Sequence, residues 1–128
     1  MPKSITHDIE VKVSPFFEES NSSPINQAFI FRYHVNIENN SNDAVQLLSR
    51  HWYIFDSNGS YKEVKGEGVI GQQPIIRSGM SHEYESYSKL TTDIGMMWGT
   101  YLMRRVKDKK LFEVKIPEFQ LIVPARLN

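Results

Sequence analysis

Apolar and polar residues alternate with a period of two along most of this chain, as in strands that bury one face. The first such run covers residues 5–13 and the second covers residues 29–37, and each run predicts one strand. The residues expected to share a face are Ile5, His7, Ile9, Val11 and Val13 in the first run, and Phe29, Phe31, Tyr33, Val35 and Ile37 in the second.

Further runs complete the strand prediction. Residues 45–55 are apolar on both faces in places, which favours a central strand covered on both sides. Residues 80–87, 96–106 and 111–123 supply the remaining strands. Pro117 interrupts the last run, which is therefore either two strands or one bent strand. No window carries a convincing helical stripe.

Turn-forming residues separate these runs, at 39–42, 56–59, 77–79 and 107–110. Residues 20–24 predict a polar loop or a disordered insertion. Short antiparallel strands at regular spacing, without helices between them, favour an all-β fold. We predict an antiparallel β-sandwich of the immunoglobulin or fibronectin type III kind, with a closed barrel as the alternative. Because 128 residues is an ordinary domain size, residues 1–128 are expected to form one domain.

Composition narrows the chemistry and the partners. The chain has no cysteine, which excludes thiol chemistry and cysteine-based metal sites and fits a cytoplasmic location. Its 15 basic and 15 acidic residues leave no basic excess, so no nucleic-acid partner is expected. No apolar run approaches the roughly 20 residues of a membrane span. The first residues lack the apolar segment of a secretory signal, so we expect a cytoplasmic protein.

The most distinctive local feature is the glycine-rich run at residues 66–71. Its glycines, Gly66, Gly68 and Gly71, have the G-x-G-x-x-G spacing of dinucleotide-binding loops, which must lead into a helix. Pro74 would stop that helix and the surrounding pattern is all-β, so we reject this interpretation. The glycines are expected first of all to permit a positive φ, a bulge or a close backbone approach.

An anion-binding use of the same run stays open. Glycines let successive backbone N–H groups point into one concavity, and such concavities bind anions. The ligand would be a phosphate-bearing small molecule. The candidate ligand-binding residues are Gly66, Gly68, Gly71, Arg50 and Arg77.

No catalytic or metal-binding constellation stands out. Ser49 and His51 share one strand face, but no carboxylate to orient the imidazole lies nearby on that face of the same strand, and Asp56 falls on the opposite face by parity. We therefore predict no enzyme, no metal site and no cofactor. None of the histidines follows a local metal-ligand spacing: His7, His34, His51 and His82.

Two other features favour a macromolecular partner. Residues 104–110 form the only basic cluster, which either protects a hairpin edge or attracts an acidic partner or a phosphate. Most strand aromatics are expected in the core, and one or two exposed on a shared face would make a protein-binding patch. Edge strands could also pair across a two-fold axis, so a homodimer is an open alternative. The aromatics in question are Trp52, Tyr53, Phe55, Tyr84, Tyr87, Trp98 and Tyr101.

Several runs, in order along nearly the whole chain, resemble the ApaG family. They are VQLLSRHW at 45–52, GEGVIGQQP at 66–74, LTT at 90–92, GM at 95–96, GTY at 99–101, Phe112, IPEF at 116–119 and PARLN at 124–128. Ser78 and Asp93 stand where the family often has proline. The resemblance implies a fibronectin type III or immunoglobulin-like sandwich. It also implies a link to cobalt and magnesium resistance or efflux in bacterial members, and a protein-binding role in eukaryotic fusions.

These observations predict a non-enzymatic binding domain that recognises a protein partner and is linked to divalent cation homeostasis. The alternative is a binder of phosphate- or pyrophosphate-bearing metabolites through the glycine-rich run, which the resemblance implies is a pyrophosphate-binding loop. Because the chain has no apolar run long enough to span a membrane, an efflux role would not be direct transport.

Overall fold

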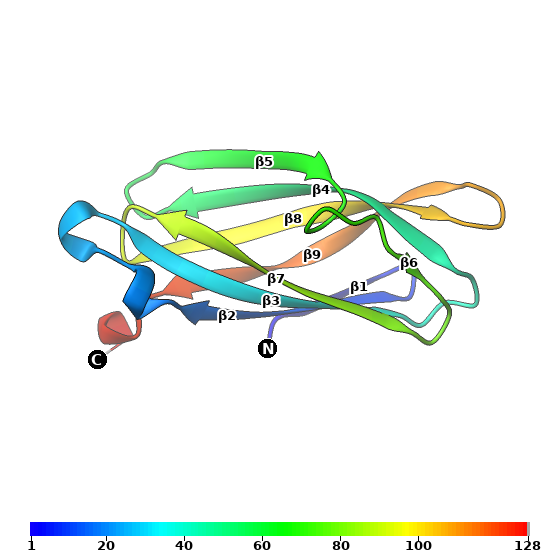
Figure 1. Ribbon diagram of the computed structural model, residues 1–128, viewed down its shortest axis with the longest axis horizontal. Helices are drawn as coiled ribbons and strands as arrows, with labels where there is room; N and C mark the ends of the chain where they lie inside the picture. The colour runs from blue at the N-terminus through cyan, green and yellow to red at the C-terminus, as the bar shows by residue number, and fades with distance from the viewer. Residues whose placement is uncertain (128) are drawn as a thin grey trace.

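The strands form two antiparallel sheets that face each other in the computed structural model, which describes residues 1–127 (Figure 1). One sheet has the order β1-β2-β3-β7, and the other has the order β5-β4-β8-β9 with β6 added beside β4. The chain is therefore an all-β sandwich, as predicted, and residues 1–127 contain no α-helix. The strands are β1 (Lys3–Thr6), β2 (Ile9–Phe17), β3 (Phe29–Asn39), β4 (Val45–Asp56), β5 (Tyr61–Glu67), β6 (Ile75–Ile76), β7 (Ser81–Leu90), β8 (Ile94–Arg105) and β9 (Leu111–Ile122).

The space between the sheets is filled by the inward-facing side chains of both. Tyr33, Trp52 and Phe119 meet at its centre, with ring centroids 5.3–5.9 Å apart. The face predicted for residues 29–37 is confirmed, since its members from Phe31 to Ile37 are buried and Phe29 packs against the core. Short 3-10 turns occupy Glu19–Asn21, Pro24–Asn26 and Pro124–Leu127. Asn128, the last residue of the ApaG resemblance, lies outside the described residues.

The single first strand predicted for residues 5–13 is wrong, because the chain folds back within it. His7 and Asp8 have φ values of 49° and 64° and form a two-residue turn, so that Thr6 lies opposite Ile9. Two positive φ values are typical of the tight turns that join antiparallel strands. As a result Ile5 is 61% exposed although Ile9 is fully buried. Alternation alone does not reveal such a turn, because the period of two continues through it.

Strand β4 is central in its sheet, as predicted, but its expected cover on both sides is wrong. A bulge at Leu48 shifts the register between Leu47 and Ser49 against β8, and a bulge reverses which face each following residue occupies. The apolar pair Leu47-Leu48 reflects this bulge and not burial on both faces. Beyond it, the outer face of β4 is partly exposed, and Phe55 is 37% exposed.

Strand β9 is one bent strand, which was one of the two alternatives for residues 111–123. Its register against β8 shifts at one point: Met97 of β8 lies opposite Phe119, but Gly99, two residues further on, lies opposite Ile116. The two residues between these partners, Pro117 and Glu118, lie opposite Trp98 alone. The proline is therefore accommodated at an irregularity at the edge of the sheet, where it breaks no regular pairing.

Candidate functional site

The outer face of the β5-β4-β8-β9 sheet carries a row of aromatic rings. Tyr53 of β4 lies directly opposite Trp98 of β8, and their rings stack with centroids 5.7 Å apart and planes 7° apart. On the other side Tyr61 of β5 lies 6.2 Å from Tyr53 at an interplanar angle of 28°. His51 stacks on Tyr53 at 4.4 Å. We refer to His51, Tyr53, Tyr61 and Trp98 as the aromatic row.

The row is held in place by its neighbours and is open to solvent. The imidazole Nε2 of His51 lies 2.9 Å from Oε1 of Glu63 on β5, which fixes the orientation of the ring. Tyr61 is 52% exposed. Rings positioned in this way offer a rigid apolar contact surface, because little side-chain entropy is lost when they are covered.

The outer face of the β1-β2-β3-β7 sheet is different, because ion pairs cover it. Arg32 binds Glu18 at 2.8 Å and Glu85 at 3.2 Å, and its guanidinium lies 4.5 Å from the centroid of the Phe16 ring. Tyr87, 59% exposed, stands on this face opposite Arg32. Charged pairs of this kind are typical of a solvated surface.

The glycine-rich run forms a tight turn between β5 and β6. The N–H of Gly68, at φ 59°, donates to the carbonyl of Leu48 at 2.8 Å. Val69 and Gln72 exchange backbone hydrogen bonds at 2.8 and 3.0 Å, with Gly71 at φ 72° between them. The side chain of Val69 is buried beneath the turn. The glycines at 68 and 71 thus occupy left-handed positions, and the N–H groups of Gly68, Val69 and Gln72 already bind carbonyls.

The structure brings Arg50 to the glycine-rich run but not Arg77. Nη1 of Arg50 donates to the carbonyls of Glu67 and Gly68, at 3.0 and 2.8 Å. A Cβ at Gly66 would lie 2.8 Å from this guanidinium, so the glycine makes room for the arginine. Arg77 lies in the turn that follows β6, where its carbonyl accepts a hydrogen bond from the N–H of Met80. No hydrogen bond described for residues 1–127 joins Arg77 to the glycine-rich run.

A shallow groove lies on the outer face of the sheet, next to the strand pair of Arg50 and Gly66, while the Arg50 side chain itself lies on the inward face with Trp52. Lys65 of β5 and His51 of β4 contribute to it, and Glu67 and Glu113 supply carboxylates. Ser49 also lines the groove, so the predicted shared face of Ser49 and His51 is confirmed. Asp56 points inward instead, as its parity predicted, and is 6% exposed.

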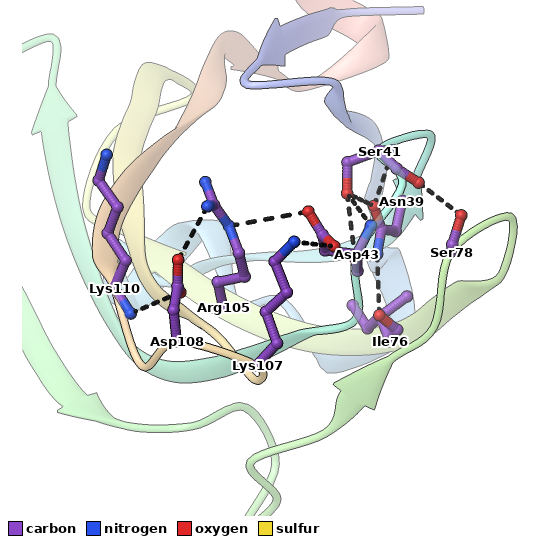
Figure 2. A network of polar contacts seen from close by, with 9 residues as sticks. All are labelled: Asn39, Ser41, Asp43, Ile76, Ser78, Arg105, Lys107, Asp108 and Lys110. Carbon is purple, nitrogen blue, oxygen red and sulfur yellow. Dashed lines mark hydrogen bonds and ion pairs between the residues drawn. The ribbon is translucent and has the colours of Figure 1, made fainter.

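The basic cluster at residues 104–110 lies in the β8–β9 hairpin, where acidic groups compensate it (Figure 2). Arg105 binds Asp108 at 3.1 Å, and Lys107 binds Asp43 at 3.2 Å. The backbone N–H of Lys110, followed by the charge of Arg105, holds the pKa of Asp108 below its usual value. Because two of its cations, Arg105 and Lys107, already have acidic partners within the chain, the interpretation that the cluster protects the hairpin edge is favoured over attraction of an acidic partner or a phosphate.

The loop that presents Asp43 is anchored by a buried amide. Asn39, fully buried, donates from Nδ2 to the carbonyls of Asp43 and Ile76 at 2.8 and 2.9 Å (Figure 2). Its Oδ1 accepts from the N–H and hydroxyl of Ser41. Ser78 closes the network by donating to the Ser41 carbonyl at 2.5 Å. The acidic partner of the basic cluster is therefore rigidly placed.

One buried tyrosine, Tyr101, and one partly buried tyrosine, Tyr84, form a hydroxyl pair inside the sandwich. Tyr84 and Tyr101 are joined by a hydrogen bond between their phenol groups. Burial raises the pKa of both phenols well above the ordinary value. They therefore stay neutral at physiological pH. Of the seven candidate aromatics, only these two and Trp52 belong to the core, so the prediction that most of them are core is wrong. The other four lie on the outer faces of the sheets: Tyr53, Phe55, Tyr87 and Trp98.

Residues 1–127 include no group of three or more His, Cys, Asp or Glu side chains placed to hold a metal ion. In the same part of the chain, no helix has the length and apolar character that a membrane crossing requires.

Sequence reasoning foresaw an exposed aromatic patch but did not find all of it. Tyr53 and Trp98 were among its candidates, whereas Tyr61 was not, because β5 was not predicted as a strand. Its sequence, YKEVKGE, has little apolar alternation. The one available signal was the turn at residues 56–59, which implies a strand after it as well as before it.

Two antiparallel sheets with these strand orders, one of them exposing an aromatic row, define an immunoglobulin- or fibronectin type III-like sandwich protein. The family model described as the ApaG domain matches residues 19–105. The chain belongs to the ApaG domain family.

Individual relatives agree with this assignment. The chain is 45% identical to Protein ApaG of Brucella suis biovar 1 and of Brucella abortus strain S19, over 98% of this chain and 96% of each relative. The solved structure of the putative ApaA protein from Bordetella pertussis superposes with a TM-score of 0.88 at 40% identity, covering 96% of each chain. A second solved structure, a structural-genomics target, has a TM-score of 0.86 at 37% identity, covering 91% of this chain and 88% of that one. None of these names includes an enzyme designation.

Proposed function

We propose that this chain is a non-enzymatic protein-binding module whose docking surface is the outer face of the β5-β4-β8-β9 sheet. The observation that supports the proposal is the aromatic row, stacked across three neighbouring strands. Tyrosine and tryptophan dominate the energetics of protein interfaces when they sit at the centre of a contact patch.

The surroundings of the row also suit an interface. Charged residues surround the rings, with Glu63 and Lys65 on β5 and Glu113 and Lys115 on β9. An apolar centre within a polar rim is the usual anatomy of a protein–protein contact. The opposite outer face, with its internal ion pairs, lacks this arrangement.

Substitution of Tyr53 and Trp98 by serine is expected to abolish capture of a specific protein from a native lysate. Truncating an interface anchor costs about 2 kcal/mol or more, which is roughly thirtyfold in affinity for each residue. The matched control is Tyr87→Ser, which removes an exposed tyrosine from the other outer face. Quantitative affinity capture measures the effect with three baits: the wild type, the Tyr53→Ser, Trp98→Ser variant and the Tyr87→Ser control. Circular dichroism checks that each bait is natively folded. Equal capture by all three baits would refute the assignment of the surface.

We further propose that the link to cobalt and magnesium homeostasis acts through the captured protein. A strain that carries only the Tyr53→Ser, Trp98→Ser variant should then have the same cation sensitivity as a strain that lacks the protein. If that strain instead tolerated cobalt and magnesium as the wild type does, the link to cation homeostasis would not depend on this surface.

The groove beside the glycine-rich run supports a second candidate, the binding of phosphate-bearing metabolites. Arg50 lies against Gly66 and Gly68 from the inward face, and Lys65 lines the groove on the outer face of the same strand edge. Nη1 of Arg50 is engaged by carbonyls, but a guanidinium carries five N–H donors, so others remain for an anion.

Calorimetric titration with pyrophosphate, nucleotides and dinucleoside polyphosphates tests this candidate. Replacing Lys65 with methionine is expected to weaken binding by about tenfold, since it removes one charge-assisted contact. The control is Lys62→Met, on the same strand but with its side chain directed toward the Lys89 carbonyl. Absence of binding heat with all three ligand classes would remove metabolite binding from consideration.

A further inference from the structure

We propose that strand β5 pairs antiparallel with β5 of a second copy of this chain, about a two-fold axis at Val64. The inference goes beyond the proposed function, because it concerns the edge of the sheet and not its aromatic face. The resulting sheet would run continuously through both copies and place their aromatic rows on one surface.

Strand β5 is a free edge of its sheet. It pairs with β4 through residues 49–55, and its other side has no strand partner in residues 1–127. The opposite side of the sandwich is closed differently. There Ser4 of β1 donates to the Lys115 carbonyl at 2.6 Å, and the Lys115 N–H donates to the Thr6 hydroxyl at 3.1 Å. Unpaired strand edges offer N–H and C=O groups to another strand.

The alternation of backbone hydrogen bonds along β5 shows which of its residues direct their N–H and C=O groups away from β4. The Asp56 N–H donates to Ser60 at 2.9 Å, and the Gly68 N–H donates to Leu48 at 2.8 Å. Residues of β5 with even numbers therefore direct their backbone groups toward β4, because bonding alternates along an antiparallel strand. The outward backbone groups belong to Tyr61, Glu63, Lys65 and Glu67.

The charges of β5 are self-complementary in one register. With the axis at Val64, Glu63 of each copy lies opposite Lys65 of the other, and Tyr61 lies opposite Glu67. Each of these pairs joins two residues with outward backbone groups. The Glu63–Lys65 pair can form a narrow hydrogen-bonded pair, whereas the Glu67 carbonyl already accepts from Nη1 of Arg50 at 3.0 Å, so Glu67 offers its N–H to Tyr61. Registers centred on Glu63 or on Lys65 instead place that residue opposite its own like charge, which is destabilising.

The remaining two side-chain positions also fit this register. Val64, 38% exposed, would cover its counterpart at the axis. Lys62 faces inward, a device that often protects edges from pairing. Here it would lie opposite Gly66, where the guanidinium of Arg50 already occupies the place of a side chain, so the Lys62 ammonium group has to keep its contact with the Lys89 carbonyl, 3.5 Å away.

Sedimentation equilibrium over a concentration series up to about 1 mM tests the pairing, since one strand pair makes a small and weak interface. We expect a monomer–dimer equilibrium. Glu63→Lys and Lys65→Glu should each weaken the dimer by about tenfold, because each places two like-charged pairs across the axis. The double variant, which reverses both charges, should restore wild-type dimerisation.

Two further variants separate this pairing from other associations. Lys65→Pro removes an outward N–H without touching a bond to β4, and should abolish the dimer. Lys89→Glu is the control on the other free edge, β7, where Glu83 could face Lys89 of a second copy. A strictly monomeric protein would overturn the proposal. So would a dimer insensitive to the single reversals, one not restored by the double variant, or one weakened by Lys89→Glu.

Discussion

Replacing Gly68 with alanine is expected to lower the free energy of unfolding by about 3 kcal/mol or more. Gly68 has a φ of +59°, and a Cβ there would lie 2.0 Å from the carbonyl oxygen of Gln72. A left-handed alanine costs about 1–2 kcal/mol by itself. Relieving the collision would also open the turn and expose the buried side chain of Val69, which is 1% exposed.

Gly71 provides the matched control for this substitution. It also has a positive φ, +72°, but a Cβ there would meet no atom within 4 Å. Gly71→Ala should therefore cost only the conformational strain of about 1–2 kcal/mol. Urea denaturation of the wild type, Gly68→Ala and Gly71→Ala measures the loss of unfolding free energy for each substitution. Equal losses would show that the close approach at Gly68 is unimportant, and would weaken the case that the run serves backbone geometry.

Replacing Asp56 with alanine is expected to cost about 2–4 kcal/mol at neutral pH. The carboxylate joins the end of β4 to the turn between β7 and β8. Its Oδ2 accepts from the N–H and the hydroxyl of Thr91, both at 2.7 Å, and its Oδ1 accepts from Thr92. Removing a buried, hydrogen-bonded charge leaves these donors without their partner.

The same site makes stability depend on pH in the acid range. Burial alone would raise the pKa of Asp56, but hydrogen bonds from Thr92 and Thr91 outweigh it and hold the pKa below its usual value. A carboxyl whose folded pKa is depressed adds stability above its unfolded pKa, about 3.9. That contribution is lost as the pH falls through the folded pKa.

Denaturation of the wild type and of Asp56→Asn between about pH 7 and pH 2.5 checks the direction of this pH dependence, because only the wild type has a carboxyl group that can titrate at position 56. The asparagine keeps the shape of the side chain. We expect the stability difference between the two proteins to shrink steadily below about pH 4. A difference that stays constant with pH would contradict a role for the ionised carboxylate.

The fold could be predicted from local pattern wherever a strand buries one face. Strand β3 is the clearest case, since its alternation from Phe31 to Ile37 corresponds directly to its burial. Strand β5 could not be predicted in this way, because an edge strand with two exposed faces needs no apolar period. The turn at His7 and Asp8 was missed for a related reason, since it preserves the period of two while reversing the chain.

The candidate site was predictable only in part. Parity placed Ser49 and His51 on one face and Asp56 on the other. It could not show that Tyr53, Tyr61 and Trp98 meet, because they come from three strands whose register is set by turns and by the bulge at Leu48. The proximity of Arg50 to the glycine-rich run, and the separation of Arg77 from it, likewise depend on strand pairing.

The amino-acid sequence by itself determined the all-β class, the absence of thiol chemistry, the ApaG family and the role of glycine where φ must be positive, and it favoured a sandwich over a closed barrel. These follow from side-chain period, composition and local sterics, which act over a few residues. Only the tertiary structure decided which outer face presents aromatic rings, which cations meet the glycine-rich run and which edge remains free. Those features arise from pairing between segments distant in the chain, where register and bulges determine which side chains come together.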